Sequence, residues 1–508
     1  MHAISLFLRV RKMSPFATAT LVLSTLSLQA CVTTNGDAAF QKLEQATQTH
    51  LAKRINWQRS EAEVELADTQ VRALLSNELS ADDAVQIALL NNPSLQAELF
   101  ELGIAEADLL QAGTLANPGL SLAYLHRGSE REVERGLHFN IAQLISMPLA
   151  IALEQRRLAQ TQSVLLNQVL QLALATRKAY IQAIAAEQTK RKLDQTLAAA
   201  QAGAELSARM LKAGNFSALQ HANQQNSYIE IKLSAMRADS AAQQTRARLA
   251  LLLGLSDRKM NGQSETASLM RLPAELPPLP ERLSPFDNPL EAEKAVQENA
   301  ALEQRLDVRA ARADMLALEK KFGLVKSNRF ISVLELGAVR NGANFEPTQH
   351  GVELRVELPL FDLGNAKIAR AEAEWRQAAS RLRATAILAH AEMQSARQQL
   401  LGTYALAQEV EQRLEPLKQQ ILDESQLRYN GMLLSVFDLL SQARAQLVSQ
   451  SLAIETKRDF WLANADYRAS SLHSIHSSQV FLFGAPSSTS ATNTNNASSL
   501  SSSGNASH

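Results

Sequence analysis

The sequence predicts a mainly α-helical protein with a small membrane β part, in which long coiled-coil helices form two structural repeats. Glycine and proline are sparse for 508 residues, at 19 and 14, while Ala, Leu and Gln recur at helical spacing. Two long stretches carry apolar residues at alternating steps of three and four, as coiled coils do. Four short segments alternate instead with the period of two that is typical of strands.

The composition excludes several classes of function. Lys and Arg number 51, and Asp and Glu also number 51, so there is no net charge to attract nucleic acid. The single cysteine, Cys31, rules out disulfides within one chain and cysteine-rich metal sites. There is no Gly-rich phosphate loop, no His-Glu-x-x-His and no Gly-x-Ser-x-Gly. We therefore expect no enzyme activity, no cofactor and no metal site, and for His473 and His476 we favour a solvated helix end over a metal site.

The N-terminus reads as a secretion signal. Arg9, Arg11 and Lys12 precede an apolar stretch, and Ala30 stands directly before Cys31. We predict that residues 1–30 are a lipoprotein signal peptide, that Cys31 is lipidated with palmitate-type acyl chains, and that residues 31–80 follow the anchor. Gln29 stands where such signals usually have a small residue, and cleavage after Ala30 without lipidation, or a short anchor helix, are the alternatives.

Only strands can span a bilayer here, because no other apolar segment reaches the roughly 18 residues of a membrane helix. Candidate strands lie at 118–126, 136–144, 329–338 and 352–358. In the last of these, Val352, Leu354 and Val356 alternate with charged residues, so we expect these three side chains to face lipid. A solvent-exposed hairpin on a soluble sheet would show the same alternation.

Two long helices should follow the strand pairs. The first has a seam repeating every seven residues, at Leu158, Leu165, Leu172, Ala179, Ala186, Leu193 and Ala200, and we expect it to run from Ala150 to Gly214. The second seam begins at Trp375 and steps by four and three as far as Ile421. A helix of about 65 residues is about 100 Å long, more than a compact enzyme domain needs.

The order of helix, strand pair, long helix and returning helix occurs twice, which predicts a first repeat at 81–271 and a second at 290–472. Between them, residues 272–289 are too rich in proline for regular structure and form a linker. Residues 473–508 are dominated by Ser, Asn and Thr toward their end, and we expect them to be disordered.

Two motifs resemble the TolC-like outer-membrane efflux protein family. The segment LSADDAVQIALLNNPSLQA at 79–97 is similar to the opening signature of that family, with Ser80 and Asp83 spaced as a helix capping box. The segment LRYNGMLLSVFDLLSQARAQL at 427–447 resembles the tip of its second helix hairpin. Ser441 stands where a second acid is common in the family, so Asp438 is the acid that matches.

The resemblance implies an outer-membrane lipoprotein of a Gram-negative bacterium that exports substrates passively. It implies a homotrimer with a shared 12-stranded barrel, working with a periplasmic adaptor protein, an inner-membrane pump and outer-membrane lipid. It also implies that Asp438 lines the periplasmic aperture and that the hairpin tips contact partners. The tip residues are Gly214, Asn215, Arg428, Tyr429, Gly431, Met432 and Ser435. We expect Gly431 to provide the left-handed cap of its tip. A periplasmic coiled-coil adaptor or a structural lipoprotein is the alternative.

Overall fold

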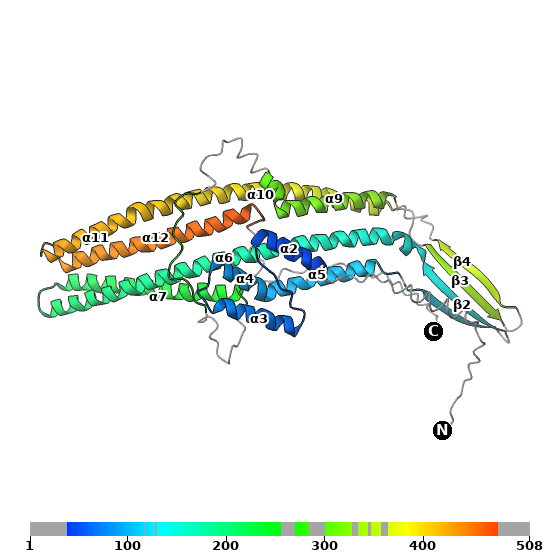
Figure 1. Ribbon diagram of the computed structural model, residues 1–508, viewed down its shortest axis with the longest axis horizontal. Helices are drawn as coiled ribbons and strands as arrows, with labels where there is room; N and C mark the ends of the chain where they lie inside the picture. The colour runs from blue at the N-terminus through cyan, green and yellow to red at the C-terminus, as the bar shows by residue number, and fades with distance from the viewer. Residues whose placement is uncertain are drawn as a thin grey trace, which may run out of the picture.

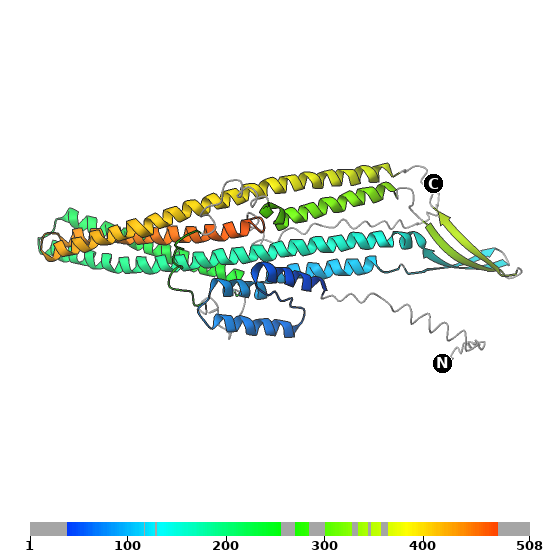
Figure 2. The same cartoon turned by 45° about the horizontal axis from the view of Figure 1, so that its top comes forward.

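The protein is a long, narrow bundle of helices with a small sheet at one end (Figure 1). The computed structural model describes residues 38–115, 117–127, 130–255, 270–283, 300–327, 334–343, 347–356 and 364–475. Cys31 and the other residues of the predicted signal lie outside these ranges, as do residues 476–508. Two helix hairpins reach the end of the molecule opposite the sheet in both views (Figures 1 and 2).

The same order of elements occurs twice along the chain. The N-terminal helices are α2 (Ala38–Leu51), α3 (Glu61–Leu75) and α4 (Ala81–Asn91). The first repeat continues with α5 (Pro93–Ala112), β1 (Gly119–Arg127), β2 (Glu130–Asn140), α6 (Ile141–Lys212) and α7 (Ala218–Leu252). The second comprises α9 (Leu306–Ser327), β3 (Leu334–Ala343), β4 (Gln349–Val356), α10 (Asn365–Glu409), the π-helix η1 (Val410–Leu414), α11 (Glu415–Asn430) and α12 (Val436–Ser470). The predicted mainly helical fold in two repeats is confirmed.

The helix α6 begins nine residues before the predicted start at Ala150, and the strand β2 accordingly ends at Asn140 rather than at 144. The side chain of Asn140 accepts a hydrogen bond from the backbone N–H of Gln143 at 2.9 Å and so caps the helix. Pro148 is the eighth residue of the helix, and its side chain is exposed. The strand-like alternation of residues 137–141 ends where this cap turns the chain.

The four strands form one antiparallel sheet in the order β1-β2-β3-β4. Over the described residues, strand β3 continues past the predicted end at 338 to Ala343, and β4 begins earlier than predicted, at Gln349. Residues 329–333 and 357–358 of the two predicted strands lie outside the described residues. The central pairing of β2 with β3 joins the two repeats within one sheet, with His138 opposite Gly337.

The main hydrophobic core lies where α4 and α5 pack against the middle of α6. Ser80 and Asp83 form the predicted capping box, which begins α4 at Ala81. Large side chains that are fully buried include Leu79, Ile87, Leu89, Leu95, Leu99, Leu102, Leu165, Leu170 and Leu172. Among the described residues this is the hydrophobic cluster with the most buried side chains, and each Å² of apolar surface that it buries contributes about 25 cal/mol. It joins the N-terminal helices to the long helix.

The coiled-coil seams are buried over their middle sections. Leu165, Leu172, Ala179 and Ala200 of the first seam are at most 3% exposed. In the second, Ala389, Ala396, Leu400, Ala407 and Val410 are buried, whereas Leu417 and Ile421 nearer the tip are 54% and 37% exposed. The small residues let helices approach closely, and the helix ends that reach the tips leave apolar side chains uncovered in the single chain.

The rod from α10 to α11 passes through one widened turn. Pro416 has no backbone N–H, and in an α-helix its ring would crowd the carbonyl four residues earlier. The π-helix η1 ends at Leu414, two residues before the proline. Its wider turn accommodates the proline, so the rod continues without interruption. The part of the proline-rich linker that is described, residues 272–283, contains neither helix nor strand.

Candidate functional site

One face of the sheet is mostly apolar, with basic residues toward the strand ends away from the helices, and the other face is mostly polar. Because side chains alternate along strands, the register places two sets of residues on opposite sides. The apolar face, called the outer face below, carries Leu120, Leu122, Tyr124, Leu137, Phe139, Leu336, Val352 and Leu354, all at least 39% exposed. The inner face carries Ser121, Glu132, Glu134, His138, Asn140, Asn341 and Glu353. An exposed apolar face of this size is what a sheet in contact with lipid requires.

Val352 and Leu354, predicted to face lipid, lie on the outer face and are 77% and 61% exposed. Val356 is the last residue of β4, and its side chain lies outside the described part of the chain. Glu353 lies between the first two and on the inner face. The geometry therefore agrees with the predicted division between apolar and charged sides over the described residues of β4.

On the inner face, the ring of His138 lies close against the backbone of the sheet. Its Nε2 lies 2.8 Å from the hydroxyl of Ser121. Gly136 and Gly337 flank the ring, and a Cβ at either position would come within 2.8 Å of a ring nitrogen. The imidazole therefore covers the backbone of two neighbouring strands, which only glycine leaves room for.

Within the part of the chain that the structure describes, the two edge strands, β1 and β4, each have one side without a strand partner. An unpaired strand edge presents N–H and C=O groups that cost several kcal/mol each when they are placed in hydrocarbon. Four strands cannot close on themselves, so a sheet of this kind in a membrane needs strands from other copies.

The two hairpin tips lie side by side at the end far from the sheet (Figure 1). The rings of Phe216 and Phe437 stack with centroids 4.6 Å apart and join the two tips. Arg444 of α12 reinforces the contact by donating to the hydroxyl of Ser227 in α7 at 2.6 Å. Neither contact was predicted from the sequence. A signal existed in the phenylalanines next to the capping serines, since Phe216 directly precedes Ser217 and Phe437 follows Ser435 by two residues.

The tip of the first hairpin turns at Gly214, which has a φ of 76°, and Asn215 follows with its N–H bonded to the carbonyl of Met210. In the second hairpin the residue with positive φ is Met432, at 58°, and not Gly431, whose φ is −79°. The prediction that Gly431 forms the left-handed cap is therefore wrong by one position. The backbone N–H of Leu433 bonds to the carbonyl of Arg428, which fixes the left-handed residue one place after Gly431.

The predicted partner-contact residues of the second tip are brought together at its surface. Met432 is 94% exposed and its neighbour Leu433 is 81% exposed, while Tyr429 is 40% exposed. Arg428 forms a 3.3 Å ion pair with Glu424 on its own helix. The tip thus presents a thioether, a leucine and a phenol to solvent, close to a guanidinium.

Asp438 lies in the first turn of α12 and is exposed. Its backbone N–H donates to the hydroxyl of the N-cap residue Ser435 at 3.2 Å, and that hydroxyl donates to its carboxylate at 2.7 Å. Within one chain, Asp438 therefore supports the helix cap. The same position leaves the carboxylate open to solvent at the tip.

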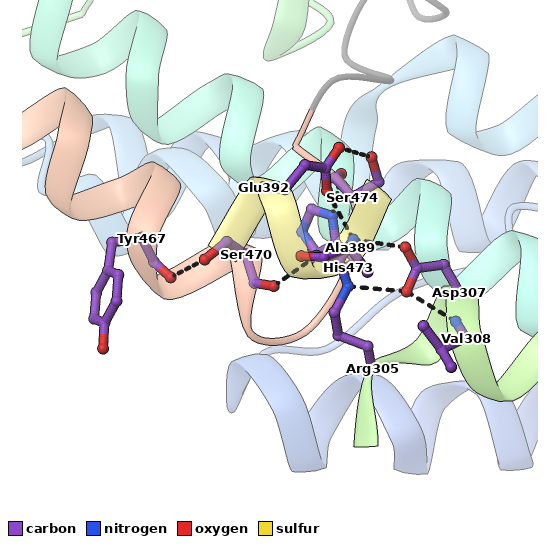
Figure 3. A network of polar contacts seen from close by, with 9 residues as sticks. All are labelled: Arg305, Asp307, Val308, Ala389, Glu392, Tyr467, Ser470, His473 and Ser474. Atoms are coloured by element: carbon purple, nitrogen blue, oxygen red, sulfur yellow. Dashed lines mark hydrogen bonds and ion pairs between the residues drawn. The ribbon is translucent and has the colours of Figure 1, made fainter. Parts of the chain in front are cut away.

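A buried ionic cluster that sequence analysis missed joins the second repeat near its middle (Figure 3). Arg305, which is fully buried, donates to Asp307 at 2.6 Å and to Glu392 at 2.8 Å. It also donates to the backbone carbonyls of Ser470 and Ala389. Burial alone lowers the pKa of Arg305, but the hydrogen bonds with the two carboxylates outweigh burial and raise it, so the guanidinium stays charged.

His473 belongs to the same cluster and is 2% exposed. The expectation of a solvated helix end is therefore wrong for this residue, and His476 lies outside the described residues. Burial is the main cause that lowers the pKa of His473, and the charge of Arg305 lowers it further. Its Nδ1 lies 2.8 Å from the carbonyl of Ser474, so the neutral ring is held as a hydrogen-bond donor.

Over the described ranges, no helix combines the length and apolarity that crossing a membrane takes. No group of three or more His, Cys, Asp or Glu side chains within those ranges is placed to hold a metal ion.

Comparison with known proteins shows which fold this is. Neither a protein-family model nor a curated protein matches the sequence. The structure is similar to a membrane protein from Pseudomonas aeruginosa, with a TM-score of 0.62 and 17% identity, covering 79% of this chain and 94% of that one. The outer membrane protein VceC from Vibrio cholerae has a TM-score of 0.61 and 15% identity, covering 78% of this chain and 96% of that one. The Campylobacter jejuni CmeC outer membrane channel has a TM-score of 0.58 and 14% identity, covering 77% of this chain and 85% of that one. The resemblance inferred from the motifs is confirmed, and this chain has the fold of TolC-like outer-membrane channel proteins.

Proposed function

We propose that this chain is the outer-membrane channel-tunnel component of a tripartite efflux or type I secretion system. It exports substrates passively across the periplasm and the outer membrane. The observation that carries the proposal is the amphipathic sheet with two open edges at one end of a long helical rod. The sheet fits a lipid environment, and the rod fits the periplasm.

Three copies complete the sheet. Each chain supplies four strands, so three chains give the 12 strands of a closed barrel in which no edge is left unpaired. With the outer face toward lipid, Glu132, Glu134 and Glu353 line a water-filled interior. Acyl chains on Cys31 would add membrane affinity of about 0.8 kcal/mol for each buried methylene.

The helices supply the tunnel. Helix α6 has 72 residues and so measures about 110 Å. Both hairpin tips lie at its far end, where we place contact with a periplasmic adaptor protein and an inner-membrane pump. Met432, Leu433 and Tyr429 offer these partners an apolar surface.

A periplasmic adaptor or a structural lipoprotein is the other candidate, since both contain long helix hairpins. Such a protein needs no sheet with an exposed apolar face. The four strands of this chain, with Val352 and Leu354 exposed, favour the channel.

Planar-bilayer recording of the purified full chain tests the proposal. We expect a trimer that conducts ions. Leu354→Arg should destabilise the assembled sheet in the membrane by about 2 to 4 kcal/mol if position 354 lies at mid-membrane. Glu353→Arg should destabilise it less, because position 353 faces the interior. A monomer without conductance, or equal tolerance at 353 and 354, would contradict the channel.

The aperture has its own test. In a trimer we place the three copies of Asp438 around the axis, where like charges repel one another and attract cations. Asp438→Asn keeps a side chain that can accept the capping bond from Ser435, so the helix should persist. We expect lower cation selectivity in single-channel recordings, and unchanged selectivity would refute the aperture position.

A further inference from the structure

A row of basic side chains crosses the outer face of the sheet. Arg135 of β2 lies opposite Arg340 of β3, which in turn lies opposite His350 of β4. All three side chains are exposed. Side chains directly opposite on neighbouring strands have their Cβ atoms about 5 Å apart, and like charges in that arrangement are destabilising. The two guanidiniums therefore repel each other, and an anion close by would relieve this repulsion.

The described part of the outer face offers no such anion. The acids whose side chains are described on the sheet, Glu132, Glu134 and Glu353, all lie on the inner face. In a closed barrel a neighbouring copy would present its outer face in the same direction, so its strands would bring more basic groups and no acid. The anion must come from the surroundings of the sheet.

The surroundings of the row are partly apolar. A hollow of ≈ 320 Å³ opens on this face, lined by the three basic residues and by Leu120, Leu137 and Ala338. The apolar residues lie one row closer to the helices, at a step of about 7 Å along the strand. The hollow thus has a cationic side and an apolar side, which matches a molecule with a charged head and hydrocarbon chains.

The depth of the row fits the boundary of a bilayer. Tyr124 lies one row further toward the strand ends that point away from the helices, and is 61% exposed. Exposed tyrosines mark the headgroup level of membrane sheets. Between Tyr124 and the apolar row of Leu137, Ala338 and Val352, the arginines lie where a lipid has its phosphate.

We propose that Arg135, Arg340 and His350 bind the phosphate of an anionic lipid in the leaflet farther from the helices, with Leu120, Leu137 and Ala338 contacting its hydrocarbon. The guanidinium fork matches phosphate oxygens in a bidentate manner. The lipid neutralises the row and fixes the depth of the sheet. This site rests on the proposed function, since it requires the sheet to lie in a membrane.

Electron spin resonance on proteoliposomes tests the site. The full chain is reconstituted with spin-labelled phosphatidic acid or spin-labelled phosphatidylcholine, and the immobilised fraction gives the relative association constant of the two lipids. We expect a preference for phosphatidic acid that Arg135→Gln/Arg340→Gln reduces by about five-fold for each arginine removed. Salt should weaken the preference, because exposed charges are screened.

A matched control is Arg381→Gln/Arg383→Gln, which removes the same charge from exposed positions on α10. This variant should retain the preference. Arg135→Lys/Arg340→Lys keeps the charge and should show an intermediate preference, and it serves as the test if the Gln variant does not assemble. Excess inorganic phosphate should displace little lipid, because free phosphate gains nothing from the apolar side of the hollow.

The outcomes separate the two proposals. If both labelled lipids are immobilised equally by the wild type, or if the control variant loses the preference as well, the lipid site is wrong while the membrane sheet stands. If inorganic phosphate abolishes the preference, the row is a general anion site and not a lipid site. If neither lipid is immobilised, the sheet does not lie in the bilayer, and both proposals fail.

Discussion

The two repeats secure the end of the returning helix in chemically different ways. In the first repeat, Asn91 and Asn92 stand just before α5, and their side-chain amides donate to the last carbonyls of α7 at 2.8 to 2.9 Å. In the second, Arg305 stands just before α9 and donates to the carbonyl of Ser470 at the end of α12 at 3.0 Å. Both satisfy carbonyls that a helix end leaves without a partner.

The difference lies in what each donor requires. We call each of these contacts between a side chain and the end of a returning helix a clamp. An amide is neutral, so the Asn91 clamp is complete once its N–H groups are bonded. Gly254, with a φ of 68°, lets the chain pass close to Asn91, where a Cβ would meet the Asn91 carbonyl at 2.3 Å. A buried guanidinium must also be neutralised, and Asp307 and Glu392 do this. The second clamp is thus a network, and it depends on the charge state of every member.

The largest effect should follow from breaking this network. Glu392→Ala removes a carboxylate that is 2% exposed and leaves Asp307 as the carboxylate bonded to the guanidinium in the described part of the chain. Removing one partner of a buried ion pair costs about 3 to 5 kcal/mol. We expect a large fall in the unfolding midpoint of the detergent-solubilised protein. Glu392→Gln keeps the volume and an acceptor but loses the charge, and should cost less than Glu392→Ala; a cost near zero for Glu392→Gln would show that the charge of Glu392 does not stabilise the network.

The neutral clamp should cost less to break. Asn91→Ala leaves the carbonyls of Leu253 and Gly254 without their donor, for about 1 to 3 kcal/mol. Asn226→Ala, at an exposed position where the side chain of Asn226 bonds to Glu230 on its own helix, is the control and should stay within about 0.5 kcal/mol of wild type. If Asn91→Ala were as destabilising as Glu392→Ala in the same unfolding measurement, the contrast between the two clamps would disappear.

The sequence drew attention to the residues of one clamp, within the motif at 79–97, but predicted the contacts of neither clamp, for a physical reason. Helix periodicity and the Ser80 capping box are local signals, so the helices, the repeats and the start of α4 could be found from the sequence. Asn91 and Asn92 stood out as part of a motif. Arg305 did not, since an arginine in a charged stretch looks solvated until α10 and α12 fold over it. Aligning the two helices that precede the strands would have placed Arg305 against Asn92.

Low pH should loosen only the charged clamp. Because burial lowers the pKa of His473 in the folded protein, the unfolded chain binds more protons once the pH falls below about 6.5, so folding loses stability there as the pH falls. Hydrogen exchange, corrected for intrinsic rates, should speed up at residues 469–473 relative to residues 249–253. His473→Gln should remove this difference, and a difference that persists in the variant would assign it to another group.

The smallest effect concerns the hairpin tips, where the repeats differ again. A non-glycine residue in the left-handed region costs about 1 to 2 kcal/mol, and Met432 bears this cost where the first tip has Gly214. Met432→Gly should therefore raise the free energy of unfolding by about 1 kcal/mol. Gly214→Ala should lower it by a similar amount, because no described atom lies within 4 Å of the added Cβ and only backbone strain changes. Urea unfolding of the two variants in detergent measures both signs. If Met432→Gly is more stable but binds its periplasmic partner less tightly, the strain is maintained for the contact that the exposed methionine makes. If it loses stability, the left-handed turn at Met432 is not strained, and the two tips are energetically alike.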